Sequence, residues 1–137
     1  MSAVTYKTPK HYNSKIQPVD VWDCYELDPY RANFVKYIER HLKKGTPKED
    51  IHKAIHYIEM FVDRNIHICH TPKMAPRVEK EFYLEAIEEW GITNPLLIGA
   101  FGFVIIGLTN GNKATREATL YSIKSLLNKY LETLEEK

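Results

Sequence analysis

The sequence has few cysteines and no long hydrophobic segment, and each shortage excludes a class of protein. Its two cysteines, Cys24 and Cys69, lack the spacing of a disulfide framework or a zinc ribbon, which favours a reducing, intracellular compartment. The longest apolar run, 95–108, has 14 residues, about 21 Å as a helix against the roughly 30 Å of a bilayer core. The polar residues 1–13 contain no apolar core of a secretory signal. We therefore expect a cytoplasmic protein that does not span a membrane.

Several common motifs are also missing. The chain has no GxxxxGK[ST] phosphate loop, no GxGxxG after a strand, no GxSxG nucleophile turn and no HExxH metal motif. The formal net charge is only +1, which argues against coating nucleic acid by bulk charge. Any binding site for an anion must therefore be local.

Helical periodicity dominates the pattern that is present. Apolar spacings of three and four residues predict helices over 18–27, 30–43, 47–65, 78–90, 95–108 and 114–135. Strand patterns and internal repeats are essentially absent from the sequence, so the predicted fold class is all-α. We expect a helical hairpin within residues 1–65, a linker over 66–77 and a three-helix half over 78–137, together forming one compact domain.

Local signals mark where these helices begin. Asp28 precedes a proline and should cap the second helix, and Thr93 or Asn94 should cap the fifth. The TPKE stretch beginning at Thr46 predicts a capping box, in which the Thr46 hydroxyl and the Glu49 carboxylate each accept an amide proton.

The C-terminal half is rich in apolar residues. The helix over 95–108 is apolar on every side and must be covered all round. Its three glycines each cost roughly 1 kcal/mol in a helix interior, so another backbone should come close. The helix over 114–135 adds an apolar stripe: Leu120, Ile123, Leu127, Tyr130, Leu131 and Leu134. We predict a homo-oligomer formed through this half, with burial wholly within one chain as the alternative.

Positive charge is concentrated between Arg31 and Lys44, where five basic residues face a single glutamate. Helical spacing places the following side chains in one band: Asn33, Lys36, Tyr37, Arg40, Lys43 and Lys44. Arginine offers a planar fork to phosphate oxygens, lysine a mobile charge, and tyrosine a stacking surface for a base. This mixture suits a nucleotide, and a solvated basic face has the same spacing.

Some histidine and carboxylate residues have a spacing that metal ligands can have. His52 and His56 lie four residues apart with Glu59 three further on, a spacing that can present all three to a metal. The HICH stretch at 67–70 could also imitate a nucleophile and its base, but no orienting third group accompanies it. A solvated stripe has the same spacing, and we predict no metal site. Four further acidic residues are interpreted as surface carboxylates rather than Mg²⁺ ligands: Asp20, Asp23, Glu49 and Asp50.

Three stretches occur in an order that resembles a known family: HYNSKIQPVDVW, NFVKYIERHLKK and EDIHKAIHYIE. The family consists of small bacteriophage proteins with the motifs HY, I-x-P-x-(D/E), GN-x-x-KYI-x-RAG-x-K and EDL-x-KA-x-x-Y. It includes a coliphage nucleotide kinase that works without a phosphate loop, and it is similar to lactococcal-phage proteins that trigger an abortive-infection system. The resemblance covers about residues 9–59 and implies a phage origin, the cytoplasm of an infected bacterium and nucleotide ligands.

The family pattern is carried over residue by residue. The resemblance implies these ligand-binding positions: His11, Tyr12, Asn33, Lys36, Tyr37, Arg40, Lys44, Lys53 and Tyr57. Asp50 also matches the pattern, whereas catalytic residues stay unassigned. This chain has Ala-Asn at 32–33 where the family has Gly-Asn, and bulky residues at 41–42 where it has Ala-Gly. These departures put phosphoryl transfer in more doubt than phosphate binding.

Three functions remain open at this point. We favour a protein that holds a small phosphorylated nucleotide or a nucleotide-derived signal, without catalysis and without a cofactor. A host-defence messenger that the protein sequesters is one such signal. The first alternative is a nucleoside monophosphate kinase without a phosphate loop, which would need Mg²⁺. The second is a helical adaptor whose basic face binds an acidic protein partner.

Overall fold

The computed structural model describes residues 16–64, 76–109 and 112–134, and the fold is all-α, as predicted. No strand occurs in these ranges. The helical elements are α1 (Pro18–Tyr25), α2 (Pro29–Arg40), α3 (Pro47–Asp63), α4 (Pro76–Glu89), α5 (Pro95–Ile105), the 3-10 turn η1 (Gly107–Thr109) and α6 (Lys113–Thr133). Most of the predicted linker lies outside the described residues.

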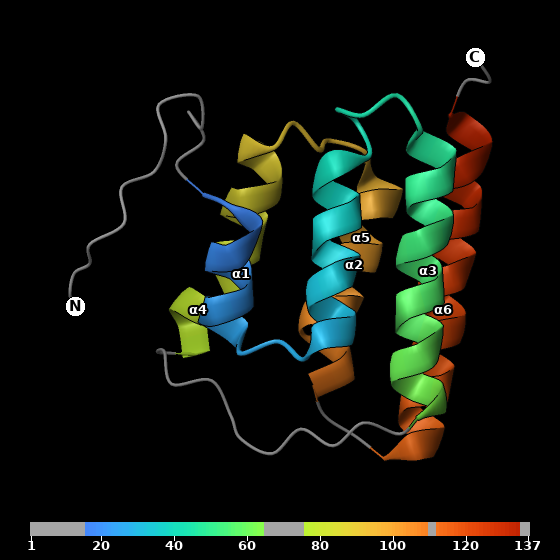
Figure 1. The fold of residues 1–137 in the computed structure, drawn as a ribbon. Helices are drawn as coiled ribbons and strands as arrows, with labels where there is room; N and C mark the ends of the chain where they lie inside the picture. The colour runs from blue at the N-terminus through green and yellow to red at the C-terminus, as the bar shows by residue number, and fades with distance from the viewer. Residues whose placement is uncertain (1–15, 65–75, 110–111, 135–137) are drawn as a thin grey trace.

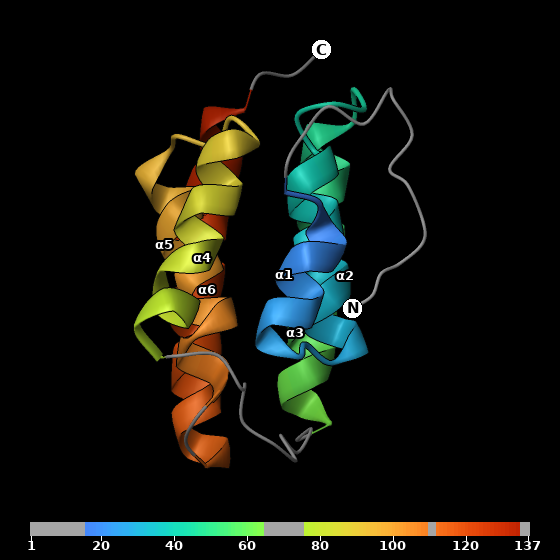
Figure 2. The ribbon, with the colours of Figure 1, turned by 90° about the vertical axis from the view of Figure 1, so that its left-hand side faces the viewer.

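The six helices form two layers (Figures 1 and 2). One layer contains α1, α2 and α3, and the other contains α4, α5 and α6. Across the layers α1 packs on α4, α2 on α5 and α3 on α6. Within the layers α2 packs most extensively on α3, and α5 on α6. Figure 1 shows α2 and α3 running antiparallel and joined by a short loop at one end of the molecule.

The core lies between the two layers and is built from both. Its fully buried aromatic residues are Phe34 on α2, Phe61 on α3 and Phe101 on α5. The Phe34 and Phe101 rings meet with centroids 5.8 Å apart, which joins α2 to α5. Burying one such side chain contributes roughly 1.5–3 kcal/mol, so the predicted apolar stripes are the main stabilising element of the fold.

The ends of the helices follow some of the predicted signals. The Asp28 carboxylate accepts the Arg31 amide at 2.9 Å, and the Asn94 side chain accepts the Leu96 amide at 2.8 Å, so both predicted caps are confirmed. The second helix ends at Arg40 rather than at residue 43 because the Lys43 and Lys44 amides both turn back to the Arg40 carbonyl.

The predicted capping box at Thr46 is wrong. The Thr46 side chain makes no capping hydrogen bond, and its backbone, at φ −127° and ψ 58°, is not in the extended conformation typical of an N-cap. The Glu49 carboxylate instead lies 3.3 Å from the Lys53 ammonium, one turn further along α3. A competing ion pair within the helix therefore replaces half of the box.

The glycines of α5 make room for side chains and not, as expected, for another backbone. A Cβ at Gly102 would lie 2.7 Å from the Tyr83 hydroxyl oxygen, which comes from α4. At Gly99 the nearest atom is a methyl carbon of Leu126 on α6, at 3.4 Å. Helix α5 is thus covered by its own neighbours on these sides.

The apolar stripe of α6 is also used within the chain. Ile123, Leu127 and Tyr130 are buried in the core, and Phe103 on α5 stays 41% exposed. Internal packing therefore accounts for most of the pattern that motivated the predicted homo-oligomer. The oligomer itself remains a prediction.

Candidate functional site

Four residues of α2 and α3 gather around the ring of Tyr37. We use the name Tyr37 cluster for the five residues Lys36, Tyr37, Arg40, Lys53 and Tyr57. The Tyr37 and Tyr57 rings stack with centroids 5.9 Å apart and planes 19° from parallel. The Lys36 ammonium, the Arg40 guanidinium carbon and the Lys53 ammonium lie 5.5, 5.5 and 5.6 Å from the Tyr37 ring centroid. Three cations thus surround one aromatic ring.

The antiparallel packing of α2 on α3 builds this cluster. Steps of one, three and four residues put Lys36, Tyr37 and Arg40 on neighbouring positions of α2, and Lys53 and Tyr57 are one turn apart on α3. Because the helices run in opposite directions, the last turns of α2 meet the first turns of α3 beside the connecting loop (Figure 1). The sequence band and the family positions on α3 therefore meet in space.

A buried carboxylate lies beneath Arg40. The Arg40 Nε atom is 3.4 Å from Asp50 Oδ2, and the Asp50 side chain is 1% exposed against 33% for Arg40. Neither atom makes a hydrogen bond to another described residue. The interpretation of Asp50 as a surface carboxylate is therefore wrong: it faces α2 from the first turn of α3. One edge of the guanidinium is held by this contact, which orients the rest toward Tyr37 and solvent.

The positive charge in and near the Tyr37 cluster is partly neutralised by neighbouring acids. Lys43 pairs with Glu39, Lys53 with Glu49, and Arg40 with Asp50. Within the described part of the chain, Lys36 and Lys44 form no ion pair. The exposed pairs are weak, so an incoming anion can compete for Lys53 at little cost.

Arg31 belongs to the core and not to the cluster. Its Nε lies 2.7 Å from Asp28 Oδ2, and its Nη1 donates to the carbonyls of Val104 and Ile105 at 3.3 and 3.4 Å. The guanidinium also lies over the Phe61 ring, 5.2 Å from the centroid. Burial lowers the pKa of Arg31, and the Asp28 carboxylate opposes this shift. One of the five basic residues thus joins α2 to the end of α5.

His41, directly behind the cluster, was not predicted as a structural residue. It is buried, with Nδ1 against the Ile38 carbonyl and Nε2 2.7 Å from the Tyr130 hydroxyl of α6. Since a carbonyl can only accept, Nδ1 carries the proton and Nε2 accepts from Tyr130. Burial lowers the pKa of His41, opposed by the Ile38 carbonyl and the Asp50 charge. His41 therefore stays neutral and fixes the end of α2 on α6.

Of the remaining predicted residues, Asn33 and Lys44 are described, and neither is part of the cluster. The Asn33 amide donates to the Pro29 carbonyl at 2.9 Å, one turn before the cluster, and Lys44 is exposed in the turn after α2. His11 and Tyr12 lie outside the described residues. Their chain continues into Ile16, whose carbonyl accepts the Trp90 indole N–H at 2.9 Å and whose amide donates to Glu89 at 2.7 Å.

The structure also bears on the metal and membrane hypotheses. Within residues 16–64, 76–109 and 112–134, no three His, Cys, Asp or Glu side chains converge as metal ligands would, His52, His56 and Glu59 included. Residues 67–70 lie outside these ranges. None of the described helices combines the length and the hydropathy needed to cross a bilayer.

Comparison with known proteins gives one match. Residues 6–59 match the model of a family described as a protein of unknown function (DUF3310), which covers less than half of the chain. Neither a comparison with curated proteins nor one with solved structures finds a match. Over α1 to α3, the segment that carries the Tyr37 cluster, the chain is therefore similar to an uncharacterised family.

Proposed function

We propose that the protein binds a small phosphorylated nucleotide, or a signal derived from one, at the Tyr37 cluster. The observation that carries this proposal is the gathering of Lys36, Arg40 and Lys53 around Tyr37, which itself stacks on Tyr57. Cations are the usual partners of phosphate oxygens, and tyrosine rings those of bases. The cluster offers both within one surface.

Each residue has a distinct role in this proposal. Arg40, oriented by Asp50, presents its free edge to the phosphate, and Lys36 adds a charge that no described acid neutralises. Lys53 exchanges its weak pair with Glu49 for the ligand. Tyr57 supports Tyr37 from one side, so that the two rings form a platform for the base.

The N-terminal segment is proposed to complete the site. The resemblance implies roles for His11 and Tyr12, five and four residues before Ile16. Figure 1 shows that α1 begins at the same end of the molecule as the α2–α3 loop. Four extended residues span at most about 13 Å, which sets the distance from Ile16 within which Tyr12 can act.

The biological setting follows from the resemblance. Residues 9–59 resemble phage proteins, and we place this protein in the cytoplasm of an infected bacterium, where it sequesters a nucleotide that serves host defence. Binding without turnover is the favoured form because this chain departs from the family pattern at 32–33 and 41–42.

Mass spectrometry of small molecules released from the purified full-length protein tests the proposal. We expect a phosphorylated nucleotide, and calorimetry with that compound, its nucleoside and inorganic phosphate should rank them in that order. Incubation with nucleoside monophosphates, ATP and Mg²⁺ should give no product by chromatography. Product formation that depends on Arg40 would replace the binder by a kinase, and a protein that neither carries nor binds any nucleotide would refute both.

A further inference from the structure

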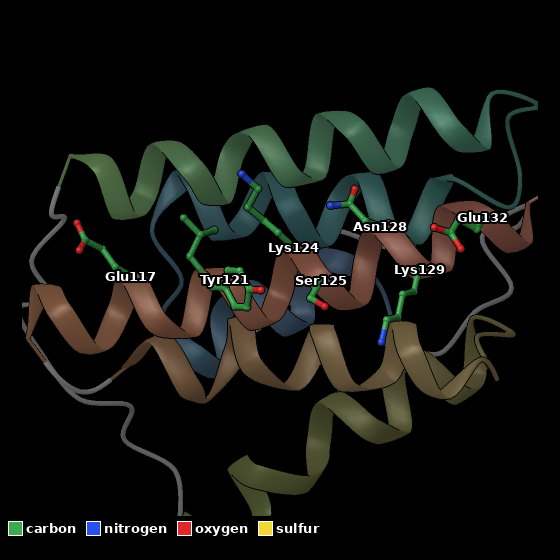
Figure 3. Close-up of a pocket in the computed structure, with 8 residues that line it drawn as sticks. Glu117, Tyr121, Lys124, Ser125, Asn128, Lys129 and Glu132 are labelled. Carbon is green, nitrogen blue, oxygen red and sulfur yellow. The ribbon is translucent and has the colours of Figure 1, made fainter.

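One face of α6 has no neighbour in the described structure. Figure 3 shows this face with α3 along one side and α5 along the other. Tyr121 projects from its middle and is 77% exposed, the highest value among the large hydrophobic residues of the described part. The face is an open hollow of about 590 Å³, lined among others by Glu117, Tyr121, Lys124 and Ser125.

The side chains on this face are ordered in rows seven residues, or two helical turns, apart. Glu117 and Lys124 form one edge, next to α3. The opposite edge, on the other side of Tyr121, is formed by Ala118 and Ser125, which are small and exposed. Tyr121 stands between the two edges. An acid and a base thus share one edge, and small residues share the other.

We propose that a second copy of this chain docks on this face, with the two α6 helices antiparallel about a two-fold axis at Tyr121. A two-fold of this kind places each edge against the same edge of the other copy. Glu117 then meets Lys124 of the second copy and Lys124 meets its Glu117, within one residue of the same level. On the other edge Ala118 meets Ser125, which lets the helices approach closely, and the two Tyr121 rings stack at the centre.

The self-complementary order of charge is the reason for choosing a second copy as the occupant. One edge that carries both an acid and a base pairs with itself twice, whereas an acidic or a basic partner would repel half of it. Lys124 already lies 2.6 Å from Glu59 on α3, so the contact adds the second copy's Glu117 to an existing pair. This interface shares no residue with the Tyr37 cluster and does not depend on the proposed function.

The dimer should be weak. One helix face buries less than the roughly 800 Å² per partner of a standard interface, and we expect dissociation in the micromolar range. Sedimentation velocity of the full chain from about 1 to 500 µM should therefore show a shift from the 16.0 kDa monomer to a dimer. A monomer at every concentration would refute the proposal.

Opposite charges at Tyr121 test the two-fold itself. Tyr121→Glu and Tyr121→Lys should each be monomeric, because each sets like charges against each other at the axis, and each should weaken association at least about tenfold. An equimolar mixture of the two variants should form the heterodimer. Association of either variant as strong as wild type, or a mixture that stays monomeric, would contradict the arrangement.

Two further variants separate this face from general effects. Leu84→Lys removes another exposed apolar side chain, 42% exposed on α4, and should dimerise like wild type. Glu117→Lys should weaken dimerisation by setting a positive charge against Lys124 of the second copy. If Leu84→Lys also abolishes the dimer, or if Glu117→Lys has no effect, the interface lies elsewhere. Circular dichroism establishes that each variant is folded.

Discussion

The two ends of the α2–α3 pair each combine arginine with tyrosine, in different surroundings. Where α2 begins, Arg31 is buried against Asp28 and two carbonyls, and Arg64 lies over Tyr30 and donates to its hydroxyl at 2.9 Å. At the loop end, Arg40 is one-third exposed and shares the Tyr37 ring with two lysines. The same residue types therefore stabilise the fold at one end and present charge to solvent at the other.

This difference explains the charge run in the sequence. A guanidinium that is buried among protein acceptors cannot receive a ligand, whereas one that is one-third exposed and held at a single edge can. Arg31 is of the first kind and Arg40 of the second. The basic residues of α2 therefore fall into two groups. Arg31, at the start of the helix, stabilises the fold, and only the basic residues in the second half of the helix belong to the candidate site.

Of the substitutions that test this comparison, replacing Arg31 should have the largest effect, which is on the free energy of unfolding. Arg31→Met leaves the Asp28 carboxylate and two carbonyls without their donor, and we expect a loss of about 3–5 kcal/mol in the free energy of unfolding. Arg64→Met, at the same end but exposed, should lose less than about 1 kcal/mol. Urea denaturation measures both. Equal losses would show that burial does not distinguish the two arginines.

The next largest effect should come from replacing Tyr37, and it should be on nucleotide affinity only. Tyr37→Ala removes the ring on which a base would stack and should cost roughly 1–3 kcal/mol in nucleotide affinity by calorimetry. Inorganic phosphate has nothing to stack, so its affinity should change far less. Tyr30→Ala is the matched control at the other end and should leave both affinities unchanged. A loss of phosphate binding as large as that of nucleotide would mean that the ring only positions the cations.

Lys36 should have a smaller effect that depends on salt. Lys36→Ala removes one exposed charge and should weaken nucleotide binding by about 0.5–1 kcal/mol at low ionic strength. The difference from wild type should shrink when the salt is raised to about 1 M, where the Debye length falls to about 3 Å. Lys129→Ala on α6 serves as the control. A difference that is independent of salt would argue against direct contact between Lys36 and a phosphate.

The smallest effect concerns pH and compares a buried histidine with an exposed one. The pKa of His41 lies below its ordinary value of 6.5 because the ring is buried, so the folded state resists a proton that the unfolded chain accepts. The contribution of His41 to the free energy of unfolding is therefore fully present above about pH 6.5 and is lost as the pH drops below it. We expect a lower urea midpoint at pH 5.5 than at pH 7.5. His41→Gln should reduce this difference, and His56→Gln, at an exposed histidine, should preserve it; the reverse pattern would contradict the assignment.

Features of the molecule that depend on neighbouring residues could be predicted from the sequence. The period of apolar residues on α2 and α3 predicted both helices, and Asp28 and Asn94 cap through residues two or three positions away. The same period separated Arg31 from the band of Arg40. The capping box predicted at Thr46 was wrong because two local interactions compete for the Glu49 carboxylate, the capping box and the ion pair with Lys53.

Features that depend on distant segments could not be predicted in this way. Asp50 has the position of an ordinary first-turn acid, and only the packing of α2 on α3 buries it. His41 is hydrogen-bonded to Tyr130, which lies 89 residues further along the chain. Arg31 donates to the carbonyl of Val104, which lies 73 residues further along. Tyr57 was indicated by the family resemblance alone, since no helical period can show that it stacks on Tyr37.

Calorimetric titration of a nucleoside monophosphate into wild type, Arg40→Lys and Arg64→Lys tests the central claim most directly. Arg40→Lys retains a charge beside Asp50 but loses the planar fork, and it should bind about ten- to a hundredfold more weakly than wild type. Arg64→Lys makes the same change over Tyr30 at the other end and should bind like wild type. If the three proteins bind alike, or if wild type binds no nucleotide, the Tyr37 cluster is a solvated basic surface and not a nucleotide site.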